Sequence, residues 1–259
     1  MNTLQEGLQT KRLGKQIIFL REVDSTNSLA KELAGYGAVE GTVVVAEAQR
    51  VGRGRKGREW YSPKGGLYFS VVLRPKCDSC EAVKLVFVAG LAVAEVLSKK
   101  YGLDVAVKWP NDVLANGKKV CGVLSEMNLA GEEVNYVVIG IGVNVNVDVI
   151  EGFPESLRKV ATSLKVELGR KVLLNELFRA LLESLDAFYE QFLKEGTVEI
   201  LCKWKKYAVF LGRQVTVADE AETLNGLALD IDGEGTLVLK LGNGALKRVF
   251  VGDVSVRLN

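Results

Sequence analysis

The sequence predicts an α+β fold, a mixed β-sheet packed with helices, followed by a small C-terminal β-barrel. Before residue 207, strand-like and helix-like segments follow no regular βα alternation, which argues against a doubly wound parallel sheet. After residue 207 the pattern changes to short alternating strands with no helix between them. The 259 residues exceed an average domain, so we expect a large domain, 16–207, and a small one, 208–259.

The elements of the large domain follow from apolar periodicity and capping residues. Residues 1–15 are polar and without a period, so we interpret them as an N-terminal tail. Strands are expected at 17–20, 42–46, 67–73, 105–108, 113–114, 119–126 and 135–144. Helices are expected after the capping residues Asp24 or Ser25, over 81–100 with Val83 in its buried stripe, over 172–193, and through Trp204.

The composition excludes several classes of function. The chain has no histidine, which excludes Ser/His/Asp triads, histidine general bases and histidine zinc ligands. A net charge of +2 is too small for a general duplex-DNA binder. One CxxC, at Cys77 and Cys80, lacks a second pair, so we expect no zinc and no permanently bound cofactor. No apolar run suits a membrane span or a signal peptide, so we expect a cytoplasmic protein with no membrane partner.

A loop of about twenty residues, 47–66, contains the most distinctive motif, Gly52-Arg-Gly-Arg-Lys-Gly-Arg58-Glu-Trp60. Its glycines also fit the G-x-G-x-x-G dinucleotide fingerprint, but residues 60–66 cannot propagate the helix which that fingerprint requires. Glycines let a backbone approach an anion closely, and guanidinium groups clamp phosphate or carboxylate. The loop is therefore predicted to bind a polyphosphate or an acyl phosphate, with a solvated basic loop as the alternative.

Three further segments combine polar residues with turns or glycines. In Lys108-Trp-Pro-Asn-Asp112, the last two residues are candidate Mg²⁺ ligands, and the nearby Lys119 could neutralise a transferring phosphate. An ordinary turn explains that segment equally well. Asp24-Ser-Thr-Asn27 is a helix cap that needs no further role. Residues 139–146 place two glycines and two asparagines in an apolar strand, which is typical of close approach by a ligand.

Taken in this order, the four segments resemble the biotin protein ligases, also called biotin–acetyl-CoA-carboxylase synthetases, from about Phe19 to the C-terminus. The loop motif resembles the family's biotinyl-adenylate loop almost letter for letter, and residues 108–112 resemble its second signature. The resemblance implies a class II synthetase-like core and an SH3-like C-terminal barrel. Only some fifteen residues precede the core, so we expect the monofunctional type, which lacks the N-terminal DNA-binding domain and binds no DNA.

The resemblance and the chemistry of the side chains together predict a role for individual residues. The biotin site would consist of Ser25, Thr26, Asn27, Gln49, Gly52, Arg53, Gly54, Arg55, Lys119, Gly122 and Leu124. The nucleotide site would consist of Arg53, Arg55, Arg58, Trp60, Asn111, Lys119 and Asn144. The catalytic residues would be Arg53, Asp112 and Lys119, with Asn111 and Asp112 as ligands of Mg²⁺. A second interpretation of Asp112, as the group that orients the incoming lysine, stays open.

The activity implied is a two-step ligation by a homodimer. Biotin and ATP would give biotinyl-5′-AMP, and biotin would then pass to a specific lysine of a biotin carboxyl carrier protein. Lipoate or octanoate ligases and transferases share a related core, but their Arg-rich, Gly-triple signature and its usual histidine are absent here. An alternative of a different class is a nucleic-acid-binding module that uses the basic loop, which the near-neutral charge disfavours.

Overall fold

The computed structural model describes residues 4–148, 152–218, 222–250 and 252–256. A seven-stranded sheet has the order β1-β2-β3-β7-β6-β5-β4, in which only the β1–β2 pair is parallel. Its strands are β1 (Gln16–Leu20), β2 (Thr42–Ala46), β3 (Leu67–Leu73), β4 (Val105–Lys108), β5 (Asp112–Ala115), β6 (Lys118–Ala130) and β7 (Glu133–Val143). This mixed sheet confirms the predicted fold class.

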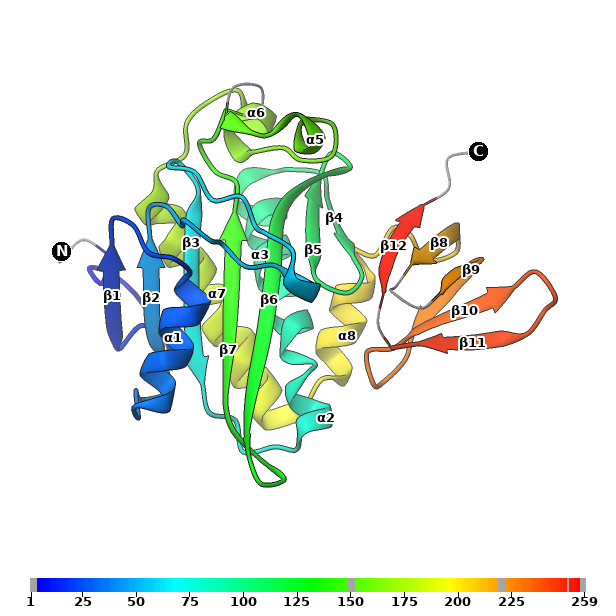
Figure 1. Ribbon diagram of the computed structural model, residues 1–259, viewed down its shortest axis with the longest axis horizontal. Helices are drawn as coiled ribbons and strands as arrows, with labels where there is room; N and C mark the ends of the chain where they lie inside the picture. Colours follow the sequence, from blue (N-terminus) through cyan, green and yellow to red (C-terminus); the bar gives the residue numbers. More distant parts are fainter. Residues whose placement is uncertain (1–3, 149–151, 219–221, 251, 257–259) are drawn as a thin grey trace.

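Helices cover both faces of the sheet (Figure 1). On one face lies α1 (Thr26–Gly35), whose Ala30 and Ala34 pack on Val44 and Val72. The other face is covered by α3 (Leu85–Tyr101) and α7 (Leu174–Glu195), with α8 (Val198–Lys205) beside α3. Because the central strands are buried on both faces, β3 is a continuous apolar run around a single serine. Two short helices, α5 (Glu155–Arg158) and α6 (Leu164–Leu168), follow β7.

The predicted helix over 81–100 is divided in two. A short helix, α2 (Ser79–Ala82), is separated from α3 by Val83 and Lys84. Hydrogen bonds of the i→i+3 type, from Lys84 N to Glu81 O and from Phe87 N to Lys84 O, tighten the chain at this point. Val83 is consequently exposed, and its assignment to the buried stripe is wrong.

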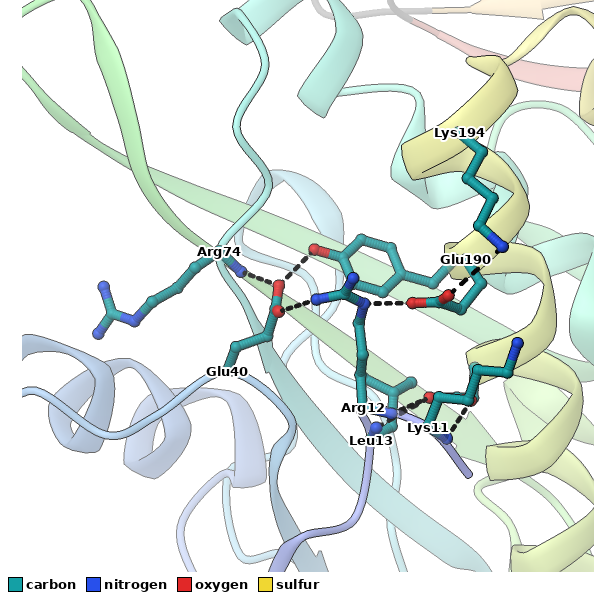
Figure 2. Close-up of polar contacts among 9 residues, drawn as sticks. Lys11, Arg12, Leu13, Glu40, Arg74, Glu190 and Lys194 are labelled. Atoms are coloured by element: carbon teal, nitrogen blue, oxygen red, sulfur yellow. Dashed lines mark hydrogen bonds and ion pairs between the residues drawn. The ribbon is translucent and has the colours of Figure 1, made fainter. Parts of the chain in front are cut away.

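The N-terminal segment is packed on α7 rather than free. Leu13 is fully buried, and the buried carboxylate of Asp186 accepts hydrogen bonds from three consecutive backbone N–H groups, those of Lys11, Arg12 and Leu13. Figure 2 shows the Arg12 guanidinium between two acidic side chains, those of Glu40 and Glu190. Residues 4–15 are therefore not the tail that the sequence led us to expect. Leu13 is buried in the core, and the buried Asp186 carboxylate takes its hydrogen-bond donors from this segment.

The last part of the chain forms a second, antiparallel sheet with the order β11-β10-β9-β8-β12. Its strands are β8 (Gln214–Ala218), β9 (Thr223–Ile231), β10 (Leu237–Leu241), β11 (Leu246–Val249) and β12 (Asp253–Val256). The Trp109 indole donates to Gly235 O at 2.9 Å, and the apolar core continues from the large sheet into this one. The division at residue 207 therefore stays a prediction. Within the described residues no helix is long and apolar enough to cross a membrane.

Candidate functional site

A pocket lies where the long loop crosses the large sheet. The loop, residues 47–66, joins β2 to β3 and passes in front of β7 and β6, with a 3-10 turn at Arg55–Gly57 (Figure 1). The cavity beneath it opens to solvent, and its empty space, open solvent included, is about 710 Å³. All the expected site residues except Gly52 and Asn144 line it. Four distant segments thus meet in one place.

The floor of the pocket is a network of uncharged polar side chains. Gln49 Oε1 accepts hydrogen bonds from Thr26 N at 2.8 Å and Thr26 Oγ1 at 3.1 Å, and Gln49 Nε2 donates to Ser62 Oγ at 2.8 Å. Ser25 is the N-cap of α1, so the helix start holds these groups in place. Ser70 Oγ, fully buried on β3, lies 2.8 Å from Thr26 Oγ1. Fixed donors and acceptors of this kind discriminate strongly between ligands, since a wrong ligand leaves them unpaired.

The mouth of the pocket is cationic, and its basic groups are paired with acids. Lys119 Nζ lies 2.7 Å from Asp112 Oδ1, and Lys108 Nζ lies 3.9 Å from Asp112 Oδ2. Lys119 Nζ is also 5.0 Å from the centre of the Trp60 ring, a cation–π distance. The adjacent strands β5 and β6 bring Asp112 and Lys119 together. The structure thus brings Lys119 into contact with the segment 108–112.

Two arginines of the loop contact the C-terminal sheet. Arg58 Nη2 pairs with Asp253 on β12, and Arg55 Nη1 lies 3.7 Å from the same carboxylate. Arg55 Nη1 also donates to Asn111 Oδ1 at 3.1 Å. Burial raises the pKa of Asp253, but the hydrogen bond and charge of Arg58 outweigh it and lower that pKa below its ordinary value. Burial lowers the pKa of Arg55.

Replacing Asp253 with Asn is expected to loosen the loop. An exposed ion pair contributes roughly 0.2–1 kcal/mol, so we expect amide exchange over residues 50–60 to accelerate about two- to fivefold. Hydrogen exchange followed by mass spectrometry checks this. Asp230→Asn is the matched control. Asp230 lies on β9 of the same sheet and pairs with Lys205 of α8, but it does not line the pocket.

The same pair gives a pH dependence with a definite sign. The pKa of Asp253 is lower in the folded protein than in the unfolded chain, where it is about 3.9. The stabilisation of the loop by Asp253 is therefore complete above the unfolded pKa and is lost as the pH falls through the folded pKa. We therefore expect the difference in amide exchange over residues 50–60 between wild type and Asp253→Asn to disappear in acid. A difference that grew below pH 4 would contradict this pairing.

Trp60 covers two glycines of the sheet. A Cβ atom at Gly122 would meet the indole ring at 2.9 Å, and one at Gly142 would meet Trp60 Nε1 at 2.4 Å. Only glycine permits this close approach, which explains the glycine-rich strand noted in the sequence. Trp60 Nε1 is buried and has no hydrogen-bond partner within the described residues.

Asn144 lies behind the pocket, outside its lining. Its Nδ2 donates to Thr162 O at 2.9 Å, and its buried Oδ1 has no hydrogen-bond partner in the described part of the chain. A buried acceptor without a partner is costly, and an exocyclic amino group of a base would satisfy it. Gly52 also lies outside the lining, packed against Trp60 O and Ser62 Oγ.

The acidic residues near the pocket do not form a metal cage. No group of three or more His, Cys, Asp or Glu side chains suited to a metal occurs among the residues described. Asn111 Nδ2 donates to Val123 O at 2.7 Å and Asn111 Oδ1 accepts from Arg55, so this amide is already used. Asp112 is the carboxylate that remains beside the cations. The site therefore fits Mg²⁺ that is bound mainly by substrate phosphates, with few ligands from the protein.

Sequence reasoning missed several pocket residues or their partners, and four of these bear on the chemistry of the site. Asp253 and Gly140 line the pocket, while Glu126 and Ser70 hold residues that do. The glycine-rich strand was a signal for Gly140. The other three have no local signal, because each acts on residues at least forty positions away in the sequence.

The comparisons with known proteins agree with this geometry. A model of the biotin/lipoate A/B protein ligase family matches residues 19–144, and one of the biotin protein ligase C-terminal domain matches 210–257. The biotin–[acetyl-CoA-carboxylase] ligase of Paracoccus denitrificans is 35% identical, over 85% of this chain and 92% of its own length. This chain belongs to the biotin protein ligases. The bifunctional ligase/repressor of Bacillus spizizenii is 36% identical, over 96% of this chain and 77% of its own length.

Solved structures of biotin protein ligases have the same fold. The enzyme from Aquifex aeolicus, in complex with biotin and ATP, superposes with a TM-score of 0.79 at 32% identity. The match covers 95% of this chain and all of that one. The family, predicted from four short motifs, and the fold class with its C-terminal barrel, predicted from the strand pattern, are thereby confirmed. The ligase interpretation is supported over the alternatives.

Proposed function

We propose that this chain is an ATP-dependent ligase that activates biotin as biotinyl-5′-AMP and joins it to a lysine of a biotin carboxyl carrier protein. One observation supports the activity best: a floor of uncharged hydrogen-bonding groups lies directly beneath a mouth of basic groups. A neutral ureido ring suits the floor, and a carboxylate that meets a polyphosphate suits the mouth.

We assign the floor and mouth residues as follows. The ureido ring contacts Ser25, Thr26 and Gln49, with Asn27, Gly122 and Leu124 shaping the pocket around it. Gly54 lets the loop backbone approach the ligand, whereas Gly52 lets the loop pack closely on Trp60 O and Ser62 Oγ. Arg53 and Arg55 bind the carboxylate and phosphate. We assign Arg58, Trp60, Asn111 and Asn144 to the nucleotide; the Oδ1 of Asn144 has no hydrogen-bond partner among the described residues.

The first step brings two anions together. A biotin carboxylate oxygen attacks the α-phosphorus of ATP, the new C–O–P bond forms, and pyrophosphate leaves. Arg53, Arg55 and Lys119 act by neutralising charge and by positioning, which needs no proton transfer. This accounts for an active site without histidine. Mg²⁺ enters as part of the ATP substrate, with Asp112 as the nearby protein carboxylate.

The second step is attack by an amine on the mixed anhydride. The acceptor Nζ must be neutral to attack the acyl carbon; the amide bond forms and AMP leaves. Asp112 is a carboxylate at the mouth, and Lys119 Nζ, 2.7 Å from its Oδ1, fixes its orientation. We assign Asp112 to orienting the incoming ammonium group and to receiving its proton, in competition with its role toward Mg²⁺.

The loop acts as a cover during both steps. It spans about twenty residues, contains five glycines and is anchored by ion pairs to groups outside it. A closed loop excludes water from the anhydride, which water would otherwise hydrolyse. Three further parts of the proposal come from the sequence: Mg²⁺ with ATP from the chemistry of residues 108–112, a homodimer from the family resemblance, and a cytoplasmic location from the pattern of apolar runs.

Pyrophosphate release tests the function directly. With Mg·ATP we expect rapid release when biotin is the acid, and little release with lipoate or octanoate. Transfer is followed as a mass increase of a biotin carrier domain, with a carrier whose acceptor lysine is replaced by Arg as the control. Release with lipoate or octanoate at a rate above that with biotin would contradict the assignment.

A further inference from the structure

Glu126, on β6, lies between the pocket floor and the cationic loop. Asn27 Nδ2 donates to its Oε2 at 3.0 Å, and Lys31 Nζ lies 2.8 Å from its Oε1. Arg53 Nη1 lies 3.1 Å from the same Oε1. Only 17% of the Glu126 side chain is exposed. One carboxylate thus contacts α1 twice and the loop once.

The contact with Glu126 fixes the orientation of the Asn27 amide. Because an ionised carboxylate only accepts hydrogen bonds, it is the amide nitrogen that faces Glu126. On the other side, the Ser70 hydroxyl donates to Asn27 Oδ1 at 2.6 Å. Asn27 Nδ2 also lies 3.4 Å from Leu124 O. The amide is held from both ends, which fixes it and the start of α1 in the pocket lining.

The network continues from Asn27 back to the loop. Ser70 lies 2.8 Å from Thr26 Oγ1, Thr26 donates to Gln49, and Gln49 donates to Ser62 at 2.8 Å. Ser62 in turn donates to Trp60 O. Hydrogen bonds therefore join the far end of the loop, through the floor, to Glu126, and Glu126 contacts Arg53 near the loop's start.

Arg53 uses only part of its guanidinium in this contact. Both distances to Glu126, 3.1 and 3.3 Å, involve Nη1. Its Nε and Nη2 have no side-chain partner among the described residues. The free edge of the guanidinium presents two donors in the geometry that matches a phosphate. Lys31 and Arg53 together outweigh the single negative charge of Glu126, so the carboxylate does not make this corner of the mouth anionic.

The carboxylate is ionised in this position. Burial raises the pKa of Glu126, but hydrogen bonds from Lys31 and Asn27 and the charge of Arg53 outweigh it and lower that pKa overall. Glu126 therefore remains an acceptor at neutral pH. Its contacts with Asn27, Lys31 and Arg53 therefore all form at neutral pH.

We propose that Glu126 is a positioning residue: it orients the Asn27 amide beneath the ureido ring and holds Arg53 with its free edge toward the adenylate phosphate. This inference rests on the proposed function. It assigns two separable contributions to one carboxylate. The first acts on biotin binding through Asn27, and the second acts on retention of the adenylate through Arg53.

Two substitutions separate these contributions. Glu126→Gln keeps an acceptor for Asn27 but removes the charge, so we expect biotin Kd within about threefold of wild type and release of biotinyl-5′-AMP about five- to tenfold faster. Glu126→Ala removes both, so we expect equally fast release and, in addition, about tenfold weaker biotin binding. Calorimetry with biotin alone gives Kd, and a chase of labelled adenylate gives release. Glu133→Gln, an exposed glutamate of the same hairpin, is the control.

A double-mutant cycle tests whether Glu126 acts through Arg53. If it does, Glu126→Gln has no further effect on adenylate release in an Arg53→Ala background. Additive effects would overturn the inference, as would wild-type release and biotin Kd in both Glu126 variants. Thermal unfolding identifies loss of fold in Glu126→Ala, and Glu126→Gln then provides the test. Failure of wild type to form adenylate from biotin and ATP would instead overturn the proposed function.

Discussion

Replacing Lys119 with Ala is expected to lower kcat/KM for biotinyl-adenylate formation by about 100- to 1,000-fold, the usual effect of removing a group that stabilises developing charge. Lys119 lines the pocket, pairs with Asp112 at 2.7 Å and lies over the Trp60 ring. In the proposed first step, Lys119 neutralises phosphate charge. Pyrophosphate release at subsaturating biotin and ATP measures the loss.

Lys118→Ala is the matched control for this prediction. Lys118 precedes Lys119 on β6, so its side chain leaves the strand on the opposite face, where it is exposed. We expect its kcat/KM to stay within about twofold of wild type, as for an ordinary surface position. Activity of Lys119→Ala within tenfold of wild type would contradict the assignment of Lys119 to the reacting centre.

The strands of the large domain could be predicted because their signals are local. Gly66 and Pro75 bound an apolar run that becomes β3, residues 67–73, as predicted. The divided helix near Val83 could not be predicted in this way. Periodicity over 81–100 favours one helix, whereas the buried side chain of Lys84 contacts Glu81 and Gly233 O. That arrangement depends on a strand pair about 150 residues further along the chain.

The candidate site shows the same division between local and distant signals. The loop motif could be found because glycines and arginines cluster within a few residues, and Asp112 because it stands in the short polar segment 108–112. Glu126 and Asp253 are single acids in unremarkable strands, and their importance comes from the arginines that the fold brings to them. Sequence reasoning therefore found the basic groups and Asp112, and missed the two acids that hold the loop arginines.

The packing between Gly140 and Asn27 leads to a second large effect. Gly140 lies on β7 between Ser70 and Leu124 of the neighbouring strands. A Cβ atom there would lie 1.9 Å from Asn27 Oδ1. Asn27 cannot move aside cheaply, since Ser70 and Glu126 hold its amide at both ends. The added methyl group must therefore displace the start of α1 from the pocket floor.

We expect Gly140→Ala to weaken biotin binding by roughly 5- to 150-fold, which corresponds to the 1–3 kcal/mol typical of overpacking a buried site. Calorimetry with biotin measures the change. Gly35→Ala, at the far end of the same helix, is the control, because a Cβ there meets nothing within 4 Å. It should leave biotin Kd unchanged and raise stability by about 0.5–1 kcal/mol. Wild-type biotin affinity in Gly140→Ala would mean that the position of Asn27 is not set by its packing on the glycine strand.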